Sequence, residues 1–192
     1  MNLSLTKKEL RTIYKEKRMA LSQDEVNFLS QKVFENFILQ FNVVENQKIN
    51  VFLPIKKFNE IDTHIFIDYF FSKKARVFVP KIQGEKMISV EIFPDSEFEI
   101  NSWGIKEPIS NTDAKLDLDY VLTPLLYCDR FGNRIGYGKG FYDSFFSTDL
   151  KIHNKIGLNF FSPNEDVDDV FEKDVALDGL ITPSGFVNFT IK

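Results

Sequence analysis

The chain has 192 residues, of which 43% are hydrophobic and 27% are charged, a balance typical of a globular protein with one sizeable core. Its net charge of -4 argues against a general affinity for nucleic acid, and no apolar run approaches the roughly 20 residues that span a membrane. The single cysteine, Cys128, excludes an intramolecular disulfide framework and suits a reducing compartment. We therefore expect residues 1–192 to form one domain, a cytoplasmic monomer that binds neither nucleic acid nor membranes.

Two amphipathic helices are predicted before any strand. Thr6 and Glu9 form a capping box for a helix that ends near Ala20, and Ser22 and Glu25 form a second box for a longer helix. One face of the first helix carries a ridge of basic residues: Lys7, Arg11, Lys15 and Arg18. Such a ridge is usually solvated. The alternative is that Lys7 and Arg11 reach phosphates or a substrate carboxylate.

Short apolar runs predict the strands, at residues 48–53, 76–80, 119–126, 155–160, 177–182 and 186–191. Residues 87–93 alternate in hydrophobicity and follow a turn at Gly84 that is too short for a crossover, so this strand should be antiparallel to its neighbour. A helix capped by Asp62 or Thr63 follows the first strand. The pattern predicts an α/β fold with a mostly parallel central sheet, helices on both faces and an antiparallel excursion.

Two loop residues are candidate ligand contacts. Glu60 follows the end of the first strand, at the edge where open α/β sheets bind ligands, although a surface glutamate is the ordinary alternative. Trp103 lies in residues 103–108, which glycine and proline should prevent from forming regular structure. It either anchors this loop to the core or stacks on a flat ligand.

A glycine-rich segment follows the strand at residues 119–126. Residues 127–143 hold four of the nine glycines together with Arg130, Arg134 and Lys139. Closely spaced glycines let backbone N–H groups converge on an anion, and the apolar residues after Gly140 predict a helix that begins at the same point. The spacing differs from the Walker A, Rossmann and protein-kinase motifs. The segment is either a phosphate cradle or a glycine-rich turn without a ligand.

The remaining residues narrow the chemistry. The two histidines, His64 and His153, have no nucleophile near them in sequence, and neither they nor Cys128 show zinc-ligand spacing. Residues 165–178 are acidic and should be mostly solvated, but magnesium needs only one or two carboxylates beside phosphates. This inventory suits nucleotide-dependent phosphoryl transfer, in which positioning and charge neutralisation dominate.

Several segments together resemble the 5-formyltetrahydrofolate cyclo-ligase family, also called methenyltetrahydrofolate synthetase. Residues 132–143 look like the glycine-rich ATP segment of that family. Residues 7–11, residues 60–63 after a Phe-Leu-Pro strand, residues 103–108 and residues 174–183 match in the family's order. Two departures are visible: Phe141 stands where tyrosine is common, and residues 125–128 differ from the usual smaller residues.

The resemblance implies an open-sandwich fold and a ligase that uses ATP and Mg²⁺ to convert 5-formyltetrahydrofolate to 5,10-methenyltetrahydrofolate, with release of ADP and phosphate. By this resemblance ATP would contact Lys7, Lys8, Glu9, Leu10, Arg11, Arg134, Ile135, Gly136, Tyr137, Gly138, Lys139, Gly140, Phe141 and Tyr142. The folate would contact Arg11, Leu53, Glu60, Trp103, Tyr137, Gly138, Lys139, Gly140 and Phe141.

The resemblance also implies catalytic and metal-binding roles. Lys139 and Arg134 would stabilise charge on the transferring phosphoryl group, and Glu60 would either hydrogen-bond the pterin or assist proton transfer. Asp143 and Asp174 would hold Mg²⁺ directly or through water. Two other functions stay open: a sugar-phosphate isomerase or acyl-CoA-handling enzyme of related architecture, and a nucleotide- or folate-binding protein without turnover.

Overall fold

The computed structural model describes residues 3–101 and 105–190, so Trp103 lies outside the described residues. A seven-stranded sheet forms the centre of the molecule, in the order β13-β12-β10-β7-β2-β3-β4. Its strands are β2 (Lys48–Val51), β3 (Arg76–Gln83), β4 (Lys86–Ile92), β7 (Tyr120–Pro124), β10 (Lys155–Leu158), β12 (Gly179–Thr182) and β13 (Gly185–Asn188). Each run predicted as a strand overlaps one of these strands, although the ends differ and β3 runs beyond residues 76–80 to Gln83.

The five inner strands are parallel, and both edge strands are antiparallel to their neighbours. From β2 the chain moves to one side, through β3 and β4, and then returns to the other side of β2 at β7. The strand order therefore reverses between β2 and β7. Ligands of open α/β sheets bind at the carboxyl edge of such a reversal.

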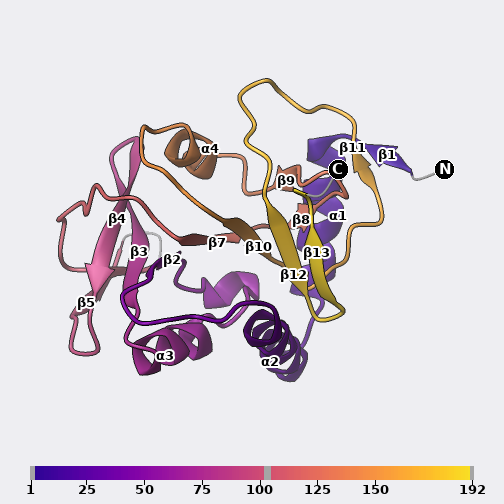
Figure 1. Ribbon diagram of the computed structural model, residues 1–192. Helices are drawn as coiled ribbons and strands as arrows, with labels where there is room; N and C mark the ends of the chain where they lie inside the picture. The colour runs from indigo at the N-terminus through magenta and orange to yellow at the C-terminus, as the bar shows by residue number, and fades with distance from the viewer. Residues whose placement is uncertain (1–2, 102–104, 191–192) are drawn as a thin grey trace.

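Helices cover both faces of the sheet, as the sequence predicts (Figure 1). The helices are α1 (Lys7–Met19), α2 (Gln23–Gln40), α3 (His64–Ser72) and α4 (Phe141–Phe146), with a 3-10 turn η1 (Lys56–Phe58). The main core joins α2 and α3 to one face of the sheet, where the Phe37, Phe66 and Phe70 rings meet edge-on with centroids 5.5, 5.6 and 6.3 Å apart. On the opposite face α4 buries Phe145 against Phe78 and Val121.

Helix α1 does not pack on the main core. Its Leu10 and Tyr14 pack against Leu126, Tyr127 and Ile135, residues of the segment that follows β7. The Tyr14 and Tyr127 rings are stacked, with centroids 4.0 Å apart. Helix α1 therefore packs against the glycine-rich segment, although the two are about 120 residues apart in sequence.

Three two-stranded pairs surround the main sheet: β1 (Ser4–Leu5) with β11 (Asp166–Val167), β5 (Phe98–Ile100) with β6 (Lys106–Pro108), and β8 (Tyr127–Cys128) with β9 (Arg134–Ile135). The prediction that residues 103–108 cannot form regular structure is wrong for Lys106–Pro108. Pro108 ends the β6 ladder opposite Phe98, and a ladder end is a position where a proline is tolerated.

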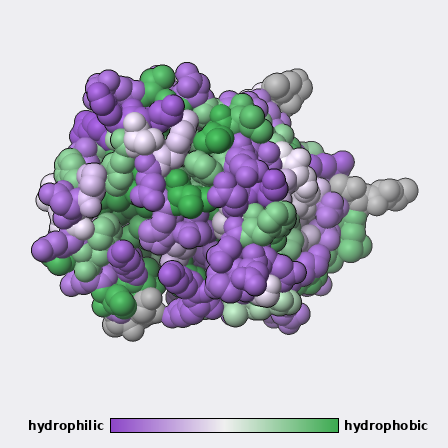
Figure 2. All heavy atoms as spheres, turned by 90° about the horizontal axis from the view of Figure 1, so that it is seen from below, coloured by the Kyte–Doolittle hydropathy of each residue, from purple (hydrophilic) through white to green (hydrophobic). Residues whose placement is uncertain are grey.

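Hydrophilic residues interrupt the hydrophobic ones across the face of the molecule that lies at the bottom of Figure 1 (Figure 2). The exposed large apolar residues include Phe28 and Leu39 on α2. Within the described ranges, no helix combines the length and the apolar character needed to cross a bilayer.

Candidate active site

The candidate site lies where three neighbouring parallel strands end. The loop after β2 carries Glu60, the loop after β7 carries the glycine-rich segment, and Asn159 directly follows β10. Because β10, β7 and β2 are adjacent in the sheet, their carboxyl ends meet at one edge. The sequence prediction that Glu60 lies at the ligand-binding edge agrees with this topology.

Glu60 is buried and hydrogen-bonded rather than a surface residue. Only 5% of it is exposed, its Oε1 accepts from the Tyr137 hydroxyl at 2.6 Å, and its Oε2 accepts from the backbone N–H of Ile55 at 2.8 Å. The Arg18 guanidinium also donates to the Tyr137 hydroxyl. Burial raises the pKa of Glu60, while these hydrogen bonds and the Arg18 charge oppose the rise.

Tyr137 therefore joins the glycine-rich segment to the loop after β2. The residue is 36% exposed, but its hydroxyl lies between Arg18 and Glu60. The Arg18 guanidinium also lies 5.5 Å from the centroid of the Tyr137 ring. Burial, followed by the Glu60 charge, raises the pKa of Tyr137, so this hydroxyl stays protonated and donates to the carboxylate.

Two cavities border Glu60. The large cleft, of about 340 Å³, is lined by Gln23, Val26, Asn27, Pro54, Lys56, Asn59, Glu60 and Asp62. The small pocket, of about 10 Å³, is lined by Arg18, Phe52, Glu60, Ile61, Pro124, Leu125, Leu158, Asn159 and Phe160. Glu60 is thus the residue that the two cavities share, and a ligand in the cleft can reach its carboxylate.

Arg11 lies against the glycine-rich segment. Its Nε donates to the carbonyl of Gly136 at 2.9 Å, and a Cβ on Gly138 would sit 3.5 Å from its Cζ atom. Gly138 has a φ of +87°, a conformation that side-chain-bearing residues rarely adopt. The loop thus contacts α1 through its backbone. Lys139, in the same loop, is exposed and has no partner among the described residues.

Two ion pairs involve the predicted metal-binding carboxylates, one between α1 and the acidic stretch and one within residues 127–143. Lys7 pairs with Asp174, and Arg134 pairs with Asp143 at 2.5 Å. The backbone of Val175 completes the link, because its N–H donates to Asp143 and its carbonyl accepts from Arg134. Asp143 therefore bonds to the residue that follows Asp174, and each carboxylate predicted to bind Mg²⁺ is neutralised by a cation predicted to bind phosphate.

This arrangement fits a magnesium site that phosphates complete. In the described part of the chain, no group of three or more His, Cys, Asp or Glu residues could hold a metal ion by itself. Magnesium needs only one or two carboxylates when phosphate oxygens and water supply the other ligands. Asp143 and Asp174 can serve as ligands once Arg134 and Lys7 exchange their carboxylate partners for phosphates.

Comparisons with known proteins give the same answer as the motifs. The model of the 5-formyltetrahydrofolate cyclo-ligase family matches residues 4–182. This chain belongs to that family. A 5-formyltetrahydrofolate cyclo-ligase from Mycoplasma pneumoniae is 30% identical over 81% of this chain and 86% of its own length. A probable cyclo-ligase from Schizosaccharomyces pombe is 25% identical over 94% and 97%.

A solved structure extends the match to three dimensions. The 5,10-methenyltetrahydrofolate synthetase from Aquifex aeolicus superimposes with a TM-score of 0.81 and 26% identity, covering 98% of this chain and 95% of the other. The open α/β sandwich predicted from sequence is therefore confirmed. As a cyclo-ligase family member, the protein is an enzyme of the ligase class.

The other residues predicted from this cyclo-ligase resemblance fall into three groups. Exposed residues at the site are Lys8, Glu9, Lys139 and Gly140. Buried or partly buried residues are Leu10, Leu53, Ile135, Phe141 and Tyr142. Leu10 and Ile135 are at most 1% exposed, and both pack in the core between α1 and the glycine-rich segment. Trp103 lies outside the described residues.

Two of these residues have evident structural roles. The Glu9 carboxylate accepts from the Thr6 hydroxyl at 2.7 Å and from the Thr6 N–H at 2.9 Å. The second bond completes the capping box of α1, and together the two bonds lower the pKa of Glu9. Tyr142 follows Gly140 in the first turn of α4, and its buried hydroxyl has no partner among the described residues. Burial, followed by the Glu60 charge, raises the pKa of this hydroxyl.

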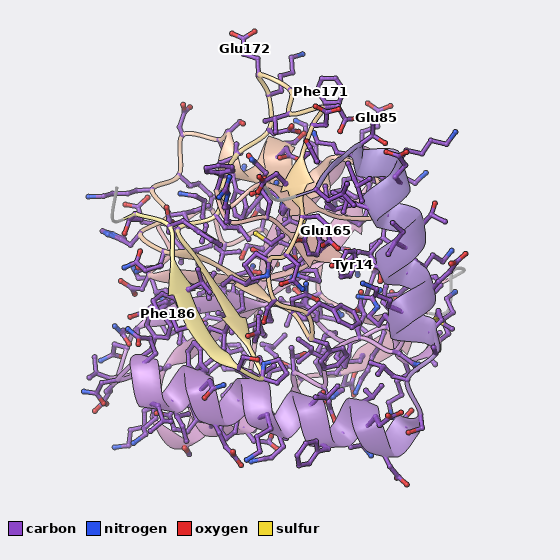
Figure 3. The ribbon with its side chains drawn as sticks, turned by 90° about the vertical axis from the view of Figure 1, so that its right-hand side faces the viewer. Tyr14, Glu85, Glu165, Phe171, Glu172 and Phe186 are labelled. Atoms are coloured by element: carbon purple, nitrogen blue, oxygen red, sulfur yellow. The ribbon has the colours of Figure 1, made fainter. Side chains whose placement is uncertain are left out.

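The sequence prediction missed three groups in the cyclo-ligase site. Arg18 was recognised only as part of a basic ridge, yet it is 4% exposed and bonds to Tyr137 and to the carbonyl of Leu125. Asn159 had the same signal as Glu60, a polar residue directly after a buried parallel strand. Glu165 belongs to the acidic stretch predicted to be mostly solvated, but Figure 3 shows it facing Tyr14, which donates to its carboxylate.

Proposed function

We propose that this protein catalyses the ATP- and Mg²⁺-dependent cyclisation of 5-formyltetrahydrofolate to 5,10-methenyltetrahydrofolate, with release of ADP and phosphate. Family membership supports the reaction class. The observation that carries the assignment to this site is the Tyr137–Glu60 hydrogen bond, which brings a glycine- and cation-rich loop against a buried carboxylate at the carboxyl edge of the sheet. Phosphate and a polar ring can therefore be held side by side.

The chemistry needs an activated formyl group, because a formamide carbon is a poor electrophile for N10. The formyl oxygen attacks the γ-phosphorus of ATP. A P–O bond forms, the bond to the bridging oxygen breaks, and ADP leaves. N10 then adds to the formyl carbon of the resulting imidate-like phosphate and loses its proton. Finally the C–O bond breaks and phosphate leaves with the former formyl oxygen, which leaves the methenyl cation shared between N5 and N10.

Residues of the glycine-rich segment and of α1 are proposed to bind ATP. Residues 134–142 supply backbone N–H groups and the Arg134 charge to the phosphates, and residues 7–11 approach from the first two turns of α1, where Arg11 already contacts the segment. Lys139, which has no partner in the described part of the chain, stabilises charge on the transferring phosphoryl group. As ATP binds, Lys7 and Arg134 leave their carboxylate partners and pair with the phosphates instead.

Asp143 and Asp174 are proposed to hold the magnesium ion. When bound, it neutralises charge on the ATP phosphates. Asp143 is paired with Arg134, and Asp174 is paired with Lys7. Both carboxylates can therefore bind the metal only after these cations have moved to the nucleotide phosphates. Nucleotide and metal should therefore bind with positive mutual coupling.

The folate is proposed to occupy the large cleft, with its pterin ring at Glu60. Leu53, at the start of the loop after β2, supplies apolar contact, and Arg11 and residues 137–141 meet the reacting end. Trp103 is proposed to stack on the pterin. Glu60 acts here as a hydrogen-bond acceptor for the ring.

An isotope experiment tests the proposed path. 5-Formyltetrahydrofolate labelled with ¹⁸O in the formyl group is converted with unlabelled ATP, and the released phosphate is analysed by mass spectrometry. Phosphorylation of the formyl oxygen predicts one labelled oxygen in each phosphate released. Phosphate without label, formed together with the methenyl product, would contradict that path.

A further inference from the structure

Two buried donors in the site have no partner. Arg18 and Asn159 are only 4% and 2% exposed, and among the described residues nothing accepts from the Nε of Arg18 or the Nδ2 of Asn159. Other atoms of these side chains are held in place, because Arg18 donates to the Leu125 carbonyl and Asn159 Oδ1 accepts from the N–H of Phe160. Buried polar groups nearly always have partners, so these two donors indicate an acceptor that binds here.

Both side chains line the small pocket, together with Glu60. Its volume of about 10 Å³ leaves room for roughly one oxygen-sized atom. The remaining lining is mainly apolar, with Phe52, Leu158 and Phe160. The pocket therefore offers two donors to one acceptor atom, directly beside a carboxylate that can accept from the neighbouring group of the same ligand.

We propose that Arg18 and Asn159 are specificity-determining residues that bind the carbonyl oxygen of a lactam on the substrate, while Glu60 accepts from the lactam N–H. This inference rests on the proposed function, since the pterin ring of the folate carries such an edge: a 4-oxo group beside N3–H. A carboxylate has about four acceptor positions, so Glu60 can accept from the ring while keeping the N–H of Ile55.

The pairing gives the site a means of rejecting close analogues. A 4-amino pteridine presents N–H groups where the 4-oxo ring presents an acceptor. Its amino group would then face the Arg18 and Asn159 donors and leave all of them unpaired. A site built around a buried hydrogen bond discriminates strongly against a ligand that cannot make it.

The test compares the affinities of two ligands and does not depend on catalytic activity. Dissociation constants of 5-formyltetrahydrofolate and of its 4-amino-4-deoxy analogue are measured by calorimetry on wild-type protein, Asn159→Leu and Asn159→Asp. Asn50→Leu is the matched control, because Asn50 is equally buried and also has an unpartnered atom, but hydrogen-bonds Ser89 inside the sheet. Circular dichroism and thermal unfolding establish which variants are folded, and Asn159→Asp keeps the shape of the side chain if the leucine is not tolerated.

The assignment predicts that wild-type protein and Asn50→Leu prefer the 4-oxo ligand, and that this preference falls at least about tenfold in the folded Asn159 variants. An unchanged preference would overturn it. That result is expected if the pocket holds only a water molecule, because the variants would then weaken both ligands equally. Wild-type protein that binds neither ligand would contradict the proposed function itself, whereas normal binding with unchanged preference would contradict this inference alone.

Discussion

At the scale of single residues, hydrogen-bond partners separate the side chains that give the site its shape from those available to bind a ligand. Glu60, Arg18 and Tyr137 are fixed by one another, whereas Lys139 is exposed and without a partner in the described structure. The sequence could predict Glu60 because it follows a strand. It could not predict the burial of Arg18, since one turn earlier Lys15 has the same charge on the same helix and is solvated.

Replacement of Lys139 should affect turnover and not stability. If Lys139 stabilises the transferring phosphoryl group, Lys139→Ala should lower kcat by about 10² or more. Its exposure predicts an unchanged melting temperature, and Lys151→Ala, at another exposed lysine, should match wild type in both respects. Steady-state kinetics with saturating ATP and folate measure this kcat. A near-normal value in Lys139→Ala would show that Lys139 does not stabilise the transferring phosphoryl group.

The pH dependence of folate binding should report Glu60. Burial raises the pKa of this carboxyl group, so it protonates at a higher pH than an ordinary glutamate as the solution is acidified. The Arg18 guanidinium, the Tyr137 hydroxyl, the Ile55 N–H and, more distantly, Tyr142 surround it, and burial raises the pKa of both tyrosines, so they stay protonated in the acid range. Folate affinity, measured by titration without nucleotide, should therefore decline on the acid side at a higher pH than an ordinary glutamate would give.

Glu60→Gln provides the comparison for this profile. Glutamine cannot titrate, so the acid decline should flatten while affinity at neutral pH falls. An identical acid limb in wild type and Glu60→Gln would assign the titration to the ligand rather than to Glu60.

At the scale of elements, the sequence predicts the structure correctly where a short local motif, such as a capping box or a tight turn, determines it. Both capping boxes form as predicted, at Thr6 and Ser22, and the strand after Gly84 is antiparallel. The β8–β9 and β5–β6 pairs escaped prediction because two- or three-residue strands depend on partners and leave no period to detect.

The start of α1 should matter for ATP as well as for stability. Thr6→Ala removes the cap and should cost about 1 kcal/mol of unfolding free energy. It should also raise KM for ATP several-fold, because Lys7 lies in the turn that would fray. Denaturant unfolding and ATP kinetics measure the two effects separately.

Ser22→Ala is the matched control, since Ser22 caps α2 with the same capping box but away from Lys7. It should lose similar stability and leave KM for ATP near the wild-type value. Equal changes in KM for ATP in both variants would mean that general destabilisation, and not the position of α1, causes the effect.

At the scale of the whole molecule, the fold could be predicted and the assembly of the site could not. Alternating strands and helices indicated the α/β sandwich, which the Aquifex aeolicus synthetase confirms. The contacts that build the site are long-range: Arg11 to Gly136, Lys7 to Asp174 and Tyr137 to Glu60. No local pattern encodes them, because each joins elements that are far apart in the sequence.

We expect the protein to be a monomer in solution. Its exposed large apolar side chains are divided among distant elements, with Leu39 on α2, Ile100 on β5 and Phe171 at the outer end of the loop before β12 (Figure 3). Sedimentation equilibrium should give a single species near 22.4 kDa over a wide concentration range. A mass that rises toward twice that value would contradict this expectation.

The most direct test of the account is a complete reaction with purified protein, MgCl₂, ATP and 5-formyltetrahydrofolate. The near-ultraviolet absorbance of the methenyl product and the amount of ADP are followed together, with each component omitted in turn. The account predicts product only in the complete mixture, with one ADP formed for each ring closed. Binding of both ATP and folate without any product, or ring closure without consumption of ATP, would contradict it.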